Sequence, residues 1–124
     1  NGEIGYHALL AFWAEEGELL FSHLRRGSAH TARNVRWFLR ETLKRVPPTA
    51  VKKLRADRGF YSKAVVEWCE AQGFTFTITA DQPVPLLAAI TAVPERRWRN
   101  LPESALAEVA ELRSRPTGWA QPYR

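Results

Sequence analysis

Hydrophobic positions divide the first half of the chain into two strands and a helix. Residues 6–14 form a mostly apolar run, a short acidic turn follows, and residues 19–24 form a second apolar run. Two such runs joined by a polar turn predict an antiparallel hairpin. Residues 31–46 then place their apolar side chains at helical spacing, and Pro47 and Pro48 end this predicted helix.

The second half of the pattern alternates strands with helices. A strand over residues 51–54 precedes a helix over residues 62–72, for which Ser62 and Gly73 are suitable N-terminal and C-terminal caps. Residues 74–80 alternate between apolar and threonine side chains, which predicts a strand with one buried face. The remaining elements have a weaker pattern and are a helix and two strands over residues 85–92, 96–101 and 107–112.

The order of these elements, β-β-α-β-α-β-α followed by β, predicts an α/β fold with a three-layer mixed sheet. A chain of 124 residues is long enough for one domain with a core. It contains no run of ~20 apolar residues that could span a bilayer, and no signal-peptide pattern. Its single cysteine, Cys69, excludes an internal disulfide. We therefore expect a cytoplasmic protein and, because the chain lacks methionine, a piece of a longer one.

Positive charge is concentrated in the middle of the chain. The net charge is +5, but residues 22–63 hold twelve Lys or Arg against only two acids, and the rest of the chain is net negative. Such a segment indicates a polyanionic partner, of which nucleic acid fits best. Most of these residues are arginine, which suits bidentate phosphate contacts. The alternative is a solvated basic face that acids balance elsewhere.

One face of the helix predicted over residues 31–46 carries a basic stripe. Its members are Arg33, Arg36, Arg40 and Lys44. Trp37 lies beside the stripe and outside the apolar set. Arginines neutralise phosphates and an indole stacks on bases, so this face fits nucleic acid. The alternative is a solvated face whose Trp37 is covered by another part of the protein.

Asp57 is the first candidate for chemistry. It is one of two aspartates in the chain, and it follows a predicted strand directly, with Gly59 close behind. A carboxylate in this position is accessible to a ligand or to Mg²⁺, which prefers carboxylate, water and phosphate oxygens. The alternative is that Asp57 accepts backbone hydrogen bonds in its own turn. His7, His23 and His30 lack metal-ligand spacing and read as structural or surface histidines.

Four segments in order resemble the core of bacterial insertion-sequence transposases of the DDE type. They are residues 5–12 (GYHALLAF), 25–33 (RRGSAHTAR), 55–62 (RADRGFYS) and 118–124 (GWAQPYR). The resemblance implies a ribonuclease H-like fold. It also implies two Mg²⁺ ions, held by two Asp and one Glu, which cut a DNA strand and join its 3′-OH to target DNA.

Residue by residue, the resemblance assigns Asp57 as the second Asp of that triad, catalytic and metal-binding. The first Asp belongs on a strand before Asn1, and the Glu on a helix beyond Arg124. The resemblance thus makes residues 1–94 the core of an incomplete catalytic domain and residues 95–124 the start of a β-rich insertion. We expect the chain by itself not to cleave DNA, because one carboxylate cannot hold two metal ions.

DNA, as transposon ends and as target, is the expected partner, in a bacterial, nucleoid-associated protein that is a homodimer when complete. The residues expected to bind DNA are Arg25, Arg26, Arg33, Arg36, Trp37, Arg40, Lys44 and Arg58. Arg58 departs from the family, which usually has a small residue there, and would place an arginine beside the metal site. Two alternatives remain: a non-catalytic DNA-binding remnant, and a different metal-dependent phosphoesterase built around Asp57.

Overall fold

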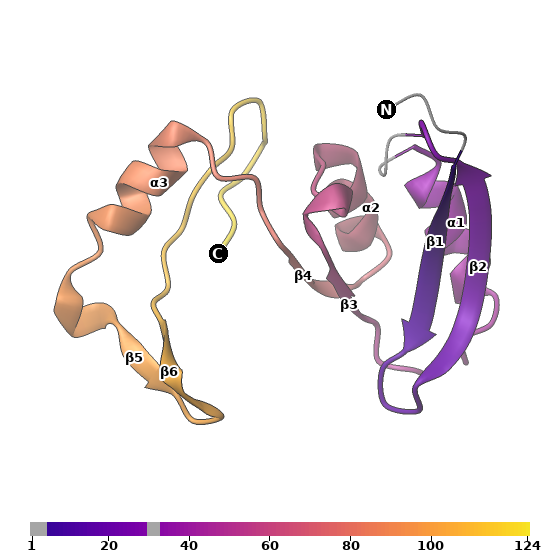
Figure 1. Cartoon of the computed structure of the whole chain (residues 1–124), viewed down its shortest axis with the longest axis horizontal. Helices are drawn as coiled ribbons and strands as arrows, with labels where there is room; N and C mark the ends of the chain where they lie inside the picture. The colour runs from indigo at the N-terminus through magenta and orange to yellow at the C-terminus, as the bar shows by residue number, and fades with distance from the viewer. Residues whose placement is uncertain (1–4, 30–32) are drawn as a thin grey trace. The chain divides into compact units, whose positions relative to one another are not determined.

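A computed structural model describes residues 5–29 and 33–124 of the chain (Figure 1). The chain divides into two compact units, Asn1–Ala80 and Asp81–Arg124. The elements of the first unit are β1 (Tyr6–Trp13), β2 (Glu18–Arg26), α1 (Val35–Leu43), β3 (Lys53–Ala56), α2 (Lys63–Ala71) and β4 (Thr75–Ile78). Those of the second are α3 (Val84–Thr91), β5 (Arg99–Leu101) and β6 (Ser104–Val109). The mixed α/β order predicted from the sequence is confirmed.

The first two strands form the predicted antiparallel hairpin. His7 pairs with Arg25 and Leu9 with His23, and the register shifts once near the turn. At the open end the backbone N–H of Gly27 donates to the carbonyl of Gly5 at 2.7 Å. A Cβ at Gly27 would meet that carbonyl oxygen at 2.8 Å, so the close approach requires glycine there.

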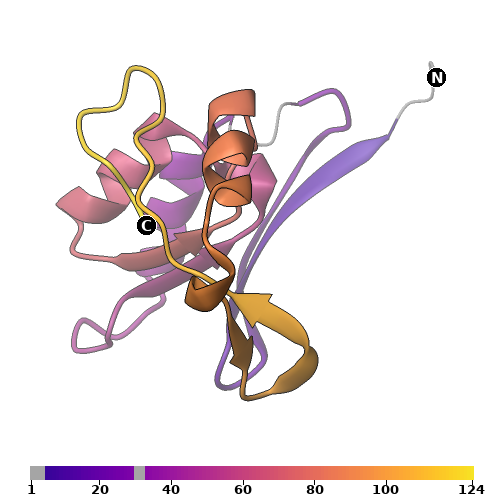
Figure 2. The same cartoon turned by 90° about the vertical axis from the view of Figure 1, so that its left-hand side faces the viewer.

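Helix α1 packs against one face of the hairpin, as both views show (Figures 1 and 2). It is shorter than residues 31–46: it runs from Val35 to Leu43, and residues 31–32 lie outside the described residues. Its N-cap, Asn34, has a left-handed backbone with φ 63° and makes no side-chain cap bond. The buried side chains of the helix are Val35, Phe38, Leu39 and Thr42, which confirms most of the apolar face read from the sequence.

Strands β3 and β4 pair in parallel, and α2 is the crossover between them. Both predicted caps are present. The Ser62 hydroxyl accepts from the Val65 backbone N–H at 3.4 Å, and Gly73 has a φ of 72° just past the helix end. In β4, Phe76 and Ile78 are half-buried while Thr75 and Thr77 are exposed, as the alternation predicted.

One hydrophobic core serves both helices of the first unit. It consists of Leu9, Val35, Phe38, Leu39, Val65 and Cys69, with half-buried side chains from β3 and β4 around it. The strands are hydrogen-bonded as separate two-stranded sheets, β1–β2 and β3–β4, within the described residues. The first unit therefore has an antiparallel and a parallel strand pair on a common core, and the described residues do not join them into the continuous mixed sheet that the sequence predicted.

The second unit holds α3 and the β5–β6 hairpin, which pairs antiparallel. Glu111 accepts hydrogen bonds from Arg99 at 3.3 Å and from Arg124 at 3.5 Å, and Ser114 bridges to Tyr123. The division after Ala80 falls earlier in the chain than the boundary expected after residue 94. Within the described parts of the chain, no helix is long and apolar enough to cross a membrane.

Candidate active site

Asp57 lies directly after β3 and begins a single 3₁₀ turn over Arg58–Phe60. Its Oδ1 accepts from the Gly59 backbone N–H at 2.8 Å, and its backbone carbonyl accepts from the Phe60 N–H at 3.1 Å. The residue is nevertheless exposed. A carboxylate has room for further ligands beside one such bond. Asp57 therefore stabilises its own turn and still has a carboxylate that a ligand can reach.

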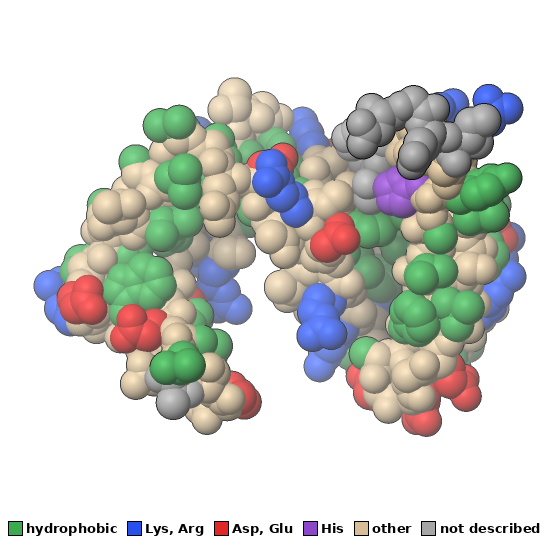
Figure 3. All heavy atoms as spheres, viewed as in Figure 1, with side chains coloured by type: hydrophobic (Ala, Val, Ile, Leu, Met, Phe, Trp, Pro, Cys, Tyr) green, Lys and Arg blue, Asp and Glu red, His purple; other side chains and the backbone are tan. Residues whose placement is uncertain are grey.

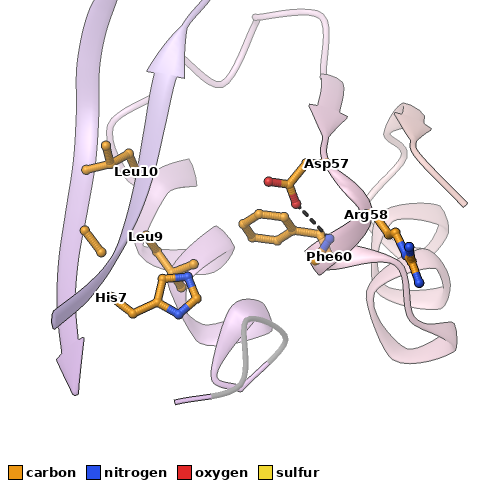
Figure 4. A pocket seen from close by; sticks show the side chains of 8 residues that line it. His7, Leu9, Leu10, Asp57, Arg58 and Phe60 are labelled. Carbon is orange, nitrogen blue, oxygen red and sulfur yellow. Dashed lines mark hydrogen bonds between the residues drawn. The ribbon is translucent and has the colours of Figure 1, made fainter. Parts of the chain in front are cut away.

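A cavity of about 530 Å³ separates this turn from β1. Residues 7–10 line one side and residues 57–60 the other. In Figure 4 the Asp57 carboxylate and the Phe60 ring point toward β1, whereas the Arg58 side chain points the opposite way. The arginine next to Asp57 in sequence thus keeps its guanidinium on the other side of the turn.

His7 is a cavity residue whose place the sequence did not reveal. Its Nδ1 lies 3.1 Å from the carbonyl oxygen of Ala29. A carbonyl only accepts, so Nδ1 carries the hydrogen of this bond. This bond agrees with the interpretation of His7 as a structural residue. His7 lies within a segment that resembles transposases, but its place in the same cavity as Asp57 depends on the packing of β1 near the turn.

Arg25 differs from the other residues expected to bind DNA because it is buried, with 8% of its surface exposed. Its Nε donates to the carbonyl of His7 at 3.4 Å, and its Nη1 to the carbonyl of Arg33 at 3.1 Å. The side chain therefore ties both strands of the hairpin to the segment that leads into α1. This geometry favours a structural role for Arg25.

The other predicted basic residues are exposed. They are Arg26, Arg33, Arg36, Arg40, Lys44 and Arg58. Those of α1 lie on the side of the helix opposite its buried face, as the sequence predicted. Lys44 forms an ion pair with Glu41 at 2.7 Å, which leaves it less available to a phosphate than Arg36 or Arg40.

Trp37 is partly packed and partly accessible. Its ring meets Phe21 edge-on at 5.9 Å and His23 at 5.0 Å between centroids, yet 39% of its surface is exposed. Arg45, which the sequence did not single out, lies over the Phe21 ring at 4.4 Å. The β2 strand thus supports Trp37 and leaves part of the indole beside the basic stripe.

Metal binding at Asp57 needs more ligands than the described residues provide. In residues 5–29 and 33–124, no group of three or more His, Cys, Asp or Glu side chains could hold a metal ion. Asp57 by itself has the oxygen donors that Mg²⁺ prefers. Asp57 can therefore supply one ligand of a metal site that other residues complete.

A mixed α/β fold that has an exposed carboxylate at the end of one strand and a helix with exposed basic side chains fits proteins that act on nucleic acids. The chain belongs to the transposase DDE domain group 1 family, whose model matches residues 1–124. This membership indicates a role in DNA transposition with DNA as the substrate, in a family that generally depends on divalent metal ions. No curated protein and no solved structure matches the chain.

Proposed function

We propose that this chain is the central part of a ribonuclease H-like transposase catalytic domain, in which Asp57 is the second of three metal-binding acids. The observation that carries the proposal is the exposed Asp57 carboxylate at the carboxyl end of β3, directed into a cavity. The family match over residues 1–124 supports the reaction class. Cleavage of a DNA strand and joining of its 3′-OH to target DNA are the proposed steps.

The two strand pairs support a single ribonuclease H-like sheet in the complete protein. Each of β1 and β3 pairs on one edge only among the described residues, and the cavity lies between β1 and the turn after β3. We propose that the strand with the first Asp, N-terminal to this chain, lies between them. An Asp at the carboxyl end of a strand parallel to β3 would reach Asp57, because such ends meet at one edge of a sheet.

The outer face of the hairpin supports a third layer. While α1 covers one face, the other exposes the large apolar side chains Tyr6, Leu10, Phe12, Leu19 and Leu24. Figure 3 shows hydrophobic side chains gathered over this hairpin. So large a contiguous apolar face normally packs against something. A helix beyond Arg124 that carries the Glu is the proposed cover.

Two Mg²⁺ ions, when bound, stabilise the attacking and leaving oxygens of the phosphodiester reaction. Asp57 supplies one carboxylate, and the first Asp and the Glu supply the others from outside residues 1–124. Asp57 also closes its own turn through Gly59, which fixes the direction of its carboxylate. We therefore propose that this chain by itself does not cleave DNA.

The exposed basic residues are the proposed DNA surface. Arg36 and Arg40 lie on the exposed side of α1, Arg33 and Lys44 lie just beyond its two ends, and Trp37 offers a partly exposed indole. Arg26 and Arg58 extend the positive charge. The proposed partners are transposon ends and target DNA, bound by a homodimer of the complete protein at the bacterial nucleoid.

The second unit is proposed to belong to a β-rich insertion between Asp57 and the Glu. The insertion was expected from residue 95, where the 3₁₀ turn Glu95–Arg97 and then β5 and β6 follow α3. The compact unit also includes α3. We propose that α3 is the link through which the core continues into the insertion.

Substitution of Asp57 in the complete transposase tests the proposal. Asn keeps the acceptor for the Gly59 N–H but loses the negative charge that holds a metal ion. Asp57→Asn is expected to reduce Mg²⁺-dependent cleavage of transposon-end DNA by roughly 10³-fold, corresponding to several kcal/mol of lost transition-state stabilisation. The melting temperature should not change.

Wild-type cleavage by Asp57→Asn would rule the catalytic assignment out. If the complete wild-type protein binds DNA but never cleaves it, the non-catalytic remnant is the better description. Mg²⁺-dependent nicking by residues 1–124 alone, abolished by Asp57→Ala, would favour a self-contained phosphoesterase instead.

A further inference from the structure

We propose that the imidazole of His7 contacts a phosphate oxygen of the DNA that binds at Asp57. The contact is a hydrogen bond from Nε2. This inference rests on the proposed function and adds a substrate-binding residue from β1, which lines the same cavity as Asp57.

A hydrogen bond to the backbone fixes the orientation of the His7 ring. Nδ1–H donates to the carbonyl of Ala29 at 3.1 Å. A histidine held in this way has one ring orientation, and its chemistry is directed through the other nitrogen. Because this bond is made through Nδ1, Nε2 is the ring nitrogen through which we propose the contact to DNA.

The charged side chains around the cavity determine which of them can bind an anion. Among the lining residues, the ionisable side chains are His7, Asp57 and Arg58. Arg58 points to the far side of the turn, and the Asp57 carboxylate repels a phosphate. His7 is therefore the lining side chain that can donate a hydrogen bond to an anion at this place. With a carbonyl at Nδ1 and a phosphate at Nε2, the proposed contact requires both ring nitrogens to carry a hydrogen while DNA is bound.

The part of β1 that carries His7 is held firmly in the fold. The backbone carbonyl of His7 accepts from the buried Arg25 at 3.4 Å, and Leu9, two positions along β1, is part of the core. The strand and the ring are thus both held before a ligand arrives. Contacts fixed in advance cost little entropy on binding, which is the property expected of a substrate-contacting residue.

Two substitutions separate the two nitrogens of His7. In His7→Asn the side-chain amide nitrogen takes the place of Nδ1, so the bond to Ala29 is kept and the Nε2 contact is lost. In His7→Gln the amide nitrogen reaches the place of Nε2, so the contact is kept as a neutral bond and the bond to Ala29 is lost. Both are introduced into the complete transposase and assayed for single-turnover cleavage at DNA concentrations below saturation and for thermal unfolding.

The proposal expects His7→Asn to lower the cleavage rate roughly 10- to 100-fold, the range of a hydrogen bond to a charged group, at an unchanged melting temperature. It expects His7→Gln to melt at a lower temperature but to cleave faster than His7→Asn. If His7→Asn cleaves like the wild type while Asp57→Asn is inactive, His7 is only structural and the assignment of Asp57 stands. If cleavage survives Asp57→Asn, the proposed function fails and this inference fails with it.

Discussion

The Oδ1 atom of Asp57 accepts a hydrogen bond from the backbone N–H of Gly59 at 2.8 Å. This bond caps the turn after β3, so removal of the acceptor should cost stability independently of any metal. Asp57→Ala is expected to lower the free energy of unfolding of this chain by about 1 kcal/mol, as the loss of a capping side chain does. Asp57→Asn should stay close to wild type, because the amide oxygen accepts the same bond. Urea denaturation measures both, and equal stabilities of the two variants would contradict the capping role.

Arg25 and Arg26 are neighbours on β2 with opposite environments, since Arg25 is buried and Arg26 is exposed. Arg25→Ala leaves the carbonyls of His7 and Arg33 without their donor and should lower the free energy of unfolding by roughly 2–3 kcal/mol. Arg26→Ala should change it by less than about 0.5 kcal/mol, as surface substitutions usually do. Thermal or chemical denaturation compares them. Equal losses of unfolding free energy in the two variants would show that the buried contacts of Arg25 do not stabilise the fold.

The basic face of α1 should give DNA binding a steep dependence on salt. Each phosphate contact that is lost lowers the slope of log K against log salt by about 0.9 on duplex DNA. Arg40→Gln is therefore expected to reduce the slope by about one contact. Lys44→Gln should reduce it less, because Lys44 already pairs with Glu41 at 2.7 Å. Filter binding over a salt series measures the slopes, and a slope unaffected by Arg40→Gln would remove that residue from the interface.

Cys69 should make stability depend on alkaline pH. Burial, with a smaller contribution from Glu70, raises the pKa of its thiol from 9.0 to about 11. Because the folded state holds the thiol proton more tightly than the unfolded chain, the contribution of Cys69 to the free energy of unfolding is constant below pH 9. It is lost as the pH rises toward 11. The melting temperature of wild type should fall more steeply over this range than that of Cys69→Ala, and parallel curves would argue against a buried thiol.

Local patterns in the sequence were sufficient for the elements and their caps. The apolar alternation of β4 and the caps Ser62 and Gly73 each depend on near neighbours along the chain, and each is confirmed. The helix predicted to run up to Pro47 instead ends at Leu43. The start of α1 was less accurate. The helix begins at Val35 after a left-handed Asn34, a backbone state that the apolar spacing does not report.

The site was predictable only in part, because burial and direction depend on distant contacts. Asp57 was identified from its place after a strand, and its exposure agrees with that interpretation. Arg25 and Arg26 look alike in the sequence, yet the strand alternation turns one toward the interior and the other outward. His7 and Asp57 are far apart along the chain, and their common cavity arises from the packing of β1 near the β3 turn.

The sequence by itself determined the order of elements, the basic middle segment, the accessible carboxylate and, through its motifs, the resemblance to DDE transposases. These are properties of composition and short-range spacing, which a chain carries whether or not it is folded. Only the tertiary structure decided that Arg58 points away from the cavity, that Arg25 binds carbonyls within the fold, and that His7 and Asp57 line one cavity. Those relationships follow from one shared core that fixes β1, α1, α2 and the β3 turn together, and no local pattern contains that information.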